Sequence, residues 1–264
     1  MIEMWLQLGL FVLVGLLAWR LSIKCPMSEY GAQPITTIDR WFLPVFLLMA
    51  WAVDELVSPM AQVWQGRFFS NHPSLHSTVT LWPWPIQVLV CLLVTDFLGY
   101  WFHRLMHTGT FWSVHALHHS SPSLNWFSGM RGSPLHMLLV IGPGTLSAAV
   151  FLQGVHPWAW FSVVLIEMLS QHFTHSNVHI PCAKQLEWWL VTPRMHFVHH
   201  HHDPRYGNSN YGFYFSFWDR LFGTYVDADD VPHRGPLGLS ENYTFTSMLL
   251  GWRLKVRNEE DLQC

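Results

Sequence analysis

The sequence is poor in charge, and the charge that it has shows no excess of basic residues. Only 12% of the 264 residues are charged, and 14 basic against 17 acidic residues give a net charge of −3. A soluble globular domain carries roughly a quarter charged residues, so this composition argues against a soluble enzyme. Without a basic surplus to neutralise phosphates, nucleic acid is not expected as a partner.

Cysteine is scarce as well, and its spacing excludes the usual sulfur sites. Cys25, Cys91, Cys182 and Cys264 are far apart, and none is in a Cys-x-x-Cys motif. The spacing therefore predicts neither a disulfide framework nor a thiolate zinc site. The chain is instead half hydrophobic and contains 18 histidines and 16 tryptophans. Tryptophan concentrates where a bilayer meets water.

Apolar stretches predict an all-α, multi-pass membrane protein with about four to five membrane helices. They cover residues 5–23, 41–57, 86–107, 134–152 and 157–169. The first is long enough for a hydrocarbon layer of ~30 Å. Its basic residues follow the apolar stretch, unlike those of a signal peptide, so it is expected to be an uncleaved anchor. Residues 58–82 are rich in turn formers and are expected to be a loop, and residues 153–156 a tight helical hairpin.

Basic residues are concentrated in residues 20–40 and after Arg194. By the positive-inside rule, the histidine-rich segments and the C-terminus are expected on the cytoplasmic side. The membrane would be the bacterial inner membrane, or the endoplasmic reticulum in a eukaryote. We expect N-terminal membrane helices and loops in 1–82, a catalytic domain in 83–230 and a polar tail in 231–264.

Histidine supplies the chemistry that the other residue types do not. Three motifs, HRLMH, HALHH and HFVHH, place imidazoles three and four residues apart, on one face of a helix. Their histidines are His103, His107, His115, His118, His119, His196, His199 and His200. Eight nitrogens suit two metal ions, and imidazole binds Fe, Zn, Cu or Ni. HRLMH lacks the glutamate of the HExxH zinc proteases, so hydrolysis by that route is not expected.

Other residues are candidates for supporting roles. His175 could add a ninth nitrogen, with His172 as its competitor, whereas His201 and His202 are expected at the surface. Asp96 lies in an otherwise apolar helix and needs a partner there, so we expect it to accept the second ring N–H of a ligand histidine. Asn125 and Arg131 could contact substrate or support a ligand, and Arg131 could equally anchor a helix at headgroup level.

The motifs HRLMH, HALHHSS, HSN, TPRMHFVHH and SNYGFYFSFWDRLFGTY, in this order, resemble those of the fatty acid hydroxylase superfamily. This superfamily of membrane oxygenases includes sterol desaturases and alkylglycerol monooxygenases. The similarity covers about residues 92–226, and it implies that the eight motif histidines, with His175, hold two irons. It further implies O2 as co-substrate and hydroxylation or desaturation of a lipid, either fatty acyl, alkylglycerol or sterol-like.

Some positions depart from the patterns of this superfamily. His136 stands where the sterol branch has glutamate, and Thr108 stands where the alkylglycerol branch has glutamate, so neither a sterol substrate nor pterin dependence transfers. No cytochrome b5-like HPGG segment is present, which implies a separate ferredoxin- or cytochrome b5-like electron donor. The competing hypothesis is a histidine-rich protein that binds or transports a divalent ion such as zinc. A third is a member of this superfamily that has lost its metal.

Overall fold

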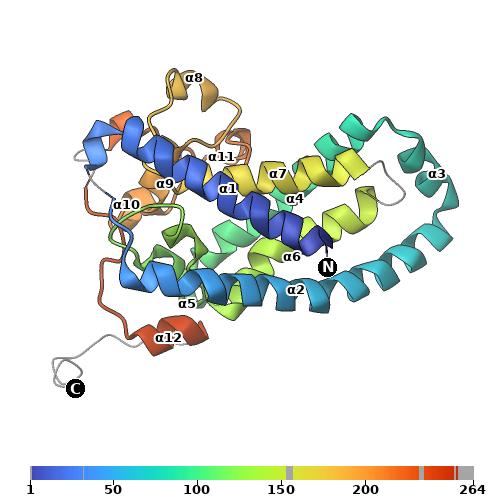
Figure 1. The fold of residues 1–264 in the computed structure, drawn as a ribbon, viewed down its shortest axis with the longest axis horizontal. Coiled ribbons are helices and arrows are strands. Elements are labelled where there is room, and N and C mark those ends of the chain that lie inside the picture. Colours follow the sequence, from blue (N-terminus) through green and yellow to red (C-terminus); the bar gives the residue numbers. More distant parts are fainter. Residues whose placement is uncertain (1, 32, 153–156, 232–234, 253, 255–264) are drawn as a thin grey trace.

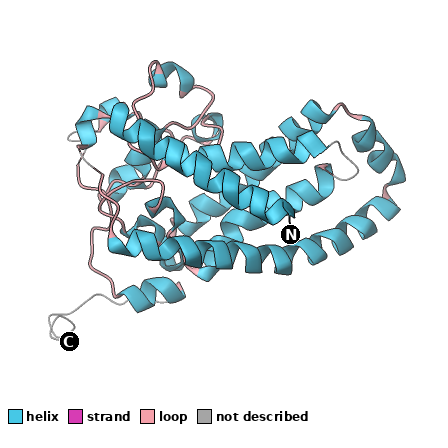
Figure 2. Cartoon of the chain, in the orientation of Figure 1, coloured by secondary structure: helices cyan, strands magenta, loops and turns pink. Residues whose placement is uncertain are grey.

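A computed structural model describes residues 2–31, 33–152, 157–231, 235–252 and 254 of the chain. These residues form helices and loops without a strand (Figure 2). The only β-type backbone pairings among them are two isolated bridges, Leu190 with Phe215 and His201 with Leu237. The predicted all-α class is therefore confirmed for the described part of the chain. The expected hairpin at 153–156 lies outside it.

Five long helices form an elongated bundle (Figure 1). They are α1 (Ile2–Lys24), α2 (Thr37–Asn71), α4 (Trp84–Met106), α6 (Pro134–Phe151) and α7 (Pro157–Thr174). α6 packs against both α2 and α4, while α7 packs against α1 and α4. Outward-facing side chains of the bundle are apolar although exposed, as with Leu48 (62% exposed) and Trp51 (57%) on α2. A water-soluble bundle would bury such residues, so this surface suits a lipid environment.

Three helices among the described residues are long and apolar enough to cross a membrane, namely α2, α4 and α6. They contain the predicted stretch 41–57 and nearly all of 86–107 and 134–152. The stretches at 5–23 and 157–169 also form helices, α1 and α7, but these are not among the three. The number of crossings thus stays a prediction.

The expected loop at 58–82 is wrong, because the segment is helical. α2 continues to Asn71, and α3 (Pro73–Leu81) follows directly, ahead of α4. The side chains of Ser77, Thr78 and Thr80 in α3 donate to carbonyls three or four residues earlier, as Thr78 does to Ser74. These hydroxyls find hydrogen-bond acceptors within the helix, so a composition typical of turns does not prevent helix formation here.

One end of the bundle carries a cap of short helices (Figure 1). The cap contains η1 (Ser28–Tyr30), η2 (Gly109–Phe111), α5 (Trp112–His115), η3 (His118–Ser120), η4 (Ser128–Met130), α8 (Ala183–Leu186), α9 (Pro193–His199), α10 (Pro204–Gly207), α11 (Phe217–Leu221), η5 (Ala228–Asp230) and α12 (Phe245–Leu250). Within the predicted polar tail, α12 packs against α5, so that part of 231–264 is folded onto the cap.

Buried polar contacts hold the short cap elements in place. Glu187 is fully buried, and its carboxylate accepts from Thr192 Oγ1 at 2.6 Å and from Arg194 at 2.8 Å. The Thr192 hydroxyl also accepts from the backbone N–H of Met195 in the first turn of α9. A seven-residue helix is too short to be stable alone, so these contacts and burial fix the orientation of α9.

Candidate metal centre

Four segments far apart in the sequence bring nine histidines to the junction of bundle and cap. His103 lies in the last turn of α4, and His107, one turn further on, directly follows the helix. α5 and η3 carry the second motif, and His175 directly follows α7. The third motif lies on α9 and on His200, the residue after it. The second motif thus lies on two short helical turns rather than on one continuous helix.

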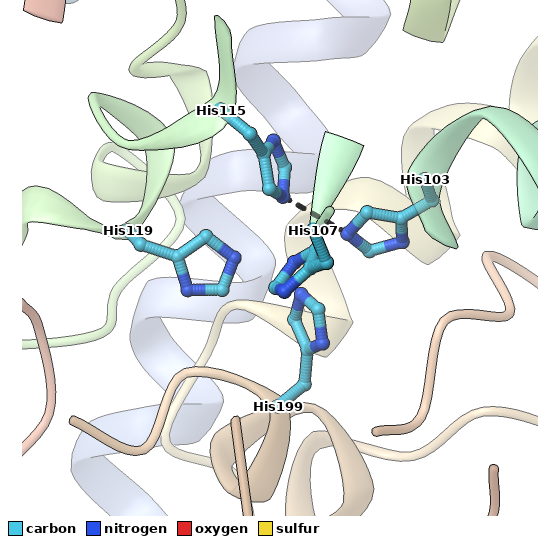
Figure 3. Close-up of side chains that lie close together, drawn as sticks. All are labelled: His103, His107, His115, His119 and His199. Atoms are coloured by element: carbon cyan, nitrogen blue, oxygen red, sulfur yellow. Dashed lines mark hydrogen bonds between the residues drawn. The ribbon is translucent and has the colours of Figure 1, made fainter. Parts of the chain in front are cut away.

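The histidines divide into two groups. The five-histidine group consists of His103, His107, His115, His119 and His199, whose potential ligand atoms all lie within 4.8 Å of one another. Figure 3 shows these rings pointing toward a common centre. His103 Nε2 lies 3.0 Å from His115 Nε2. Within the described chain, the Nε2 atoms of His107, His119 and His199 are buried without a hydrogen-bond partner.

The four-histidine group consists of His118, His175, His196 and His200, again with ligand atoms within 4.8 Å. Its Nε2 atoms form a chain of close contacts: His118 to His175 at 3.2 Å, His175 to His196 at 3.0 Å and His196 to His200 at 3.2 Å. The two groups adjoin, because the His119 and His200 rings stack with centroids 4.2 Å apart.

The second nitrogen of several rings shows which tautomer is present. His103 Nδ1 lies 2.8 Å from the carbonyl of Tyr211, and His118 Nδ1 lies 3.1 Å from that of Arg131. His175 and His199 use the carbonyls of Gln171 and Ser209 in the same way. A carbonyl only accepts, so each Nδ1 must carry the hydrogen and each Nε2 of a neutral ring must hold a lone pair.

Lone pairs that face one another require a cation between them. His118 and His175 both donate through Nδ1, yet their Nε2 atoms lie 3.2 Å apart and cannot bond to each other in neutral rings. A metal ion relieves this opposition, and imidazole nitrogens with backbone carbonyls behind them are a common arrangement around metals. The residues present therefore fit two metal ions, one in each group.

Burial keeps the cap imidazoles neutral. Desolvation, reinforced by repulsion from neighbouring imidazoles, holds the pKa well below the usual value of histidine for His115, His118, His119, His196, His199 and His200. Burial likewise lowers the pKa of His175 to about 4. Neutral imidazole is the form that binds metal, so the rings need not lose a proton at neutral pH.

The structure places His175 in the four-histidine group and leaves His172, its competitor, outside both groups. His172 is buried against Phe11 and Trp126 instead. His201 is also outside both groups, but it is buried rather than on the surface as expected, and its Nδ1 accepts from the backbone N–H of Asp203.

Asp96 does not make the contact expected from the sequence. Its carboxylate accepts the backbone N–H groups of Phe213, Tyr214 and Phe215, at 2.8, 3.1 and 2.7 Å. The loop that it holds includes Tyr211, the carbonyl partner of His103. Asp96 satisfies its buried charge with backbone donors, so it supports the ligand through a loop and not through a ring N–H.

Asn125 and Arg131 also make contacts within the cap. The Asn125 side chain accepts from the backbone of Phe127 and Ser128, forming a local turn. The Arg131 guanidinium is buried and bonds Asp39 at 2.6 Å. The guanidinium is thus engaged by Asp39, and the backbone carbonyl of Arg131 accepts from His118 Nδ1.

An apolar cavity of about 320 Å³ adjoins the metal centre. His103, His115, His118, His175 and His196 line one part of it. The remainder is lined mainly by side chains of α1, α2, α6 and α7, among them Phe11, Phe46, Ala50, Met137, Val140, Ile141 and Met168. The cavity thus connects both histidine groups with the apolar interior of the bundle.

Sequence reasoning gave no role to two residues that the structure places at the centre. His136, on α6, lies 2.9 Å from His115 through their Nδ1 atoms. Asp219 is buried and accepts the backbone N–H groups of Tyr211 and Gly212, in the loop that orients His103. His136 was noted only because it stands where the sterol branch has glutamate, and Asp219 only as one residue of the motif SNYGFYFSFWDRLFGTY, without a role of its own.

Comparison with known proteins agrees with this geometry. The family model described as fatty acid hydroxylase matches residues 88–224. Alkylglycerol monooxygenase of Xenopus tropicalis is 32% identical over 55% of this chain and 32% of its own length. Ornithine lipid hydroxylase OlsE of Rhizobium tropici is 33% identical over 54% of this chain and 43% of its own. Methylsterol monooxygenase 1 of Danio rerio is 28% identical over 75% of this chain and 68% of its own.

The chain aligns with less than half the length of the alkylglycerol monooxygenases and the ornithine lipid hydroxylase that it resembles. No solved structure matches it. The matched segment nevertheless covers all nine clustered histidines and more than half of the residues. The chain therefore belongs to the fatty acid hydroxylase family.

Proposed function

We propose that this protein is a membrane-embedded, non-haem diiron monooxygenase that hydroxylates a C–H bond of a lipid. The observation that carries the proposal is that both histidine groups line the same apolar cavity, inside a bundle whose surface suits lipid. Relatives named for action on alkylglycerols, an ornithine lipid and methylsterols support a lipid substrate. Desaturation of the same substrate class is the alternative outcome.

The residues that would hold the two irons are the five-histidine group for one ion and the four-histidine group for the other. When bound there, iron supplies the activation of O2 that no amino-acid side chain can provide. The protein's own part is to hold nine imidazoles neutral and oriented. Backbone carbonyls fix the His103, His118, His175 and His199 rings through Nδ1, so that their Nε2 atoms need little rearrangement on binding.

The cavity would hold the substrate and keep water away. Its walls from α2 and α6 offer mainly apolar contacts to a hydrocarbon chain, for example from Ala50, Val140 and Ile141. Excluding water directs the oxidant to carbon. Overall, one atom of O2 enters the C–H bond and the other leaves as water, which requires two electrons and two protons. We assign the electrons to a separate ferredoxin- or cytochrome b5-like protein.

We place the cap on the cytoplasmic side, on the distribution of basic residues. The basic side chains of Lys184, Arg194 and Arg205 belong to the cap, where all three make ion pairs. The positive-inside rule then orients the histidine groups toward the cytoplasm, where soluble electron donors are found.

Binding or transport of zinc is the competing function. Transport sites lie near the middle of the membrane, at broken helices. Here the histidines instead lie in the last turn of α4, directly after α4 or α7, or on and beside the short cap helices. This position favours catalysis over transport.

The test combines metal analysis with lipid analysis. The full chain is purified in mild detergent, and lipid extracts are compared between cells that express the wild type and His118→Ala. We expect two irons per wild-type chain and an oxygenated lipid that disappears in the variant. Stoichiometric zinc, unchanged lipids and altered zinc tolerance of the cells would overturn the proposal in favour of transport.

A further inference from the structure

His136 is a tenth buried imidazole beside the metal centre, and it belongs to neither histidine group. It occupies the first turn of α6, where its backbone N–H donates to the Ser133 hydroxyl. Its ring stacks on His115 of the five-histidine group (centroids 4.8 Å apart, 30° between planes) and on His118 of the four-histidine group (5.0 Å, 24°). The ring therefore lies across both groups and faces the cavity.

The contact between His136 and His115 differs from the Nδ1 contacts of the other clustered histidines. The Nδ1 atoms of His103, His107, His118, His175 and His199 all meet oxygens, which belong to backbone carbonyls or, for His107, to the Asn208 amide. His115 Nδ1 meets the Nδ1 of His136 at 2.9 Å. An imidazole nitrogen can donate or accept, so this contact leaves the tautomer of His115 open where a carbonyl would fix it.

The neighbouring ring settles the direction in the metal-binding state. His103 donates through Nδ1 to a carbonyl, so its Nε2 holds a lone pair, and that atom lies 3.0 Å from His115 Nε2. For both to bind one ion, His115 Nε2 must hold a lone pair too. His115 Nδ1 then carries the hydrogen, and His136 Nδ1 is the acceptor within reach.

The chain leaves room for this ring at a specific position. A Cβ at Gly132 would lie 2.3 Å from His136 Cδ2, closer than real contacts allow. Only glycine at 132 therefore permits the stacked position of His136. The Ser133 cap and the missing side chain at 132 together fix the imidazole against His115.

We infer that His136 is a positioning residue that accepts the Nδ1 hydrogen of His115 and thereby directs His115 Nε2 into the five-histidine group. This inference rests on the proposed function, since it concerns metal binding at that group. Loss of such a supporting partner typically weakens metal affinity by roughly 10- to 100-fold. The effect belongs to the five-histidine ion, because His118, the other ring that His136 touches, has its Nδ1 held by the Arg131 carbonyl.

The experiment titrates metal-free protein with Co²⁺ in detergent, by optical absorption and by bound metal after desalting. His136→Leu removes the acceptor at similar bulk, and His136→Asn keeps an acceptor oxygen near the place of Nδ1. His172→Leu is the matched control, since His172 is buried on α7 but belongs to neither group. We expect two ions for the wild type, for His136→Asn and for the control. For His136→Leu we expect one ion at concentrations that saturate the wild type.

Other outcomes separate this inference from the proposed function. A wild type that binds no metal would overturn both. Two tightly bound ions in His136→Leu, loss of both ions together, or equal loss in His136→Asn would overturn the inference alone. So would equal loss in His172→Leu, because the effect would then come from packing. The single ion retained by His136→Leu shows that the variant has folded.

Discussion

At the scale of single residues, the metal centre depends on what lies behind each imidazole. Four rings turn Nδ1 toward backbone carbonyls and Nε2 toward the centre. The carbonyl that holds His103 belongs to Tyr211, in a loop that the buried side chains of Asp96 and Asp219 hold in place. The orientation of a ligand ring therefore depends on residues that touch no histidine.

Asp96→Asn tests this dependence. The carboxylate accepts three backbone N–H groups, whereas the amide offers one acceptor oxygen and adds donors that face the same N–H groups. We expect iron content or turnover to fall roughly 10- to 100-fold, as for other residues that support metal ligands. Metal per chain, measured by mass spectrometry, checks this result. Asp54→Asn, at an exposed position on α2, is the control, and equal metal in all three proteins would contradict the expectation.

The ion pair between Arg131 and Asp39 is a second residue-scale test. Both side chains are buried, at 3% and 0% exposure, so Arg131→Met leaves an unpaired carboxylate in the interior. Breaking such a pair costs about 3–5 kcal/mol, whereas replacing both charges costs much less. We expect a lower melting temperature in detergent for Arg131→Met and partial recovery in Asp39→Asn/Arg131→Met. A double variant no more stable than the single one would contradict this account.

At the scale of elements, the structure shows where the sequence was informative. The apolar stretches at 41–57 and 86–107 predicted the first half of α2 and α4, and the spacing of the histidine motifs predicted the convergence of eight rings, with His175 as a candidate ninth. The histidines of the second motif converge although its helix is broken into two short turns, one with His115 and one with His118. The spacing of the motif therefore predicted the convergence even though the expected continuous helix is absent there. The carbonyl partners could not be predicted, since every residue has a carbonyl and only the loop conformation selects one.

The segment 58–82 and His136 show the opposite case. Turn-forming composition suggested a loop, but the segment is helical, and the Thr78 and Thr80 hydroxyls in α3 bond to carbonyls of their own helix. His136 was recognised only as a departure from a motif, because its partner His115 lies 21 residues away and on another element. The spacing of residues within one helix predicts which of them share a face. The contact between His115 and His136 depends instead on how α6 packs against the cap, which the spacing does not contain.

Gly129 in η4 tests how closely the cap elements must approach. A Cβ at this position would lie 2.5 Å from Cγ of His175, whose ring is held by the Gln171 carbonyl. In Gly129→Ala the ring must move, so we expect loss of the ion in the four-histidine group while the other ion stays. Metal per chain should fall from two to about one.

Gly66→Ala is the matched control for Gly129→Ala. Gly66 lies in α2 with open space around the added methyl group. Alanine inside a helix stabilises by roughly 0.5–1 kcal/mol relative to glycine, so this variant should keep both metals and melt no lower. Two metals retained in Gly129→Ala would show that η4 can shift away from His175 at little cost.

At the scale of the whole molecule, bundle and cap have separate tasks that meet at the cavity. The cap supplies most of the ligand histidines, while α1, α2, α6 and α7 supply most of the apolar walls. Substrate binding and metal binding should therefore be separable by mutation, although both sets of residues line one space of about 320 Å³. A defect in the walls should change which lipids react and how tightly they bind, without removing metal.

Ala50→Phe tests this separation, because Ala50 lies on α2 and lines the cavity far along the chain from every ligand histidine. The added ring occupies space that a hydrocarbon chain would need. Since overpacking costs about 1–3 kcal/mol, kcat/KM for the lipid should fall about tenfold or more. Leu48→Phe, on the exposed side of the same helix, should keep both turnover and metal. If Ala50→Phe lost its metal along with its activity, bundle and cap would act as one unit. If it kept full turnover, the lipid would have to reach the histidines by another path.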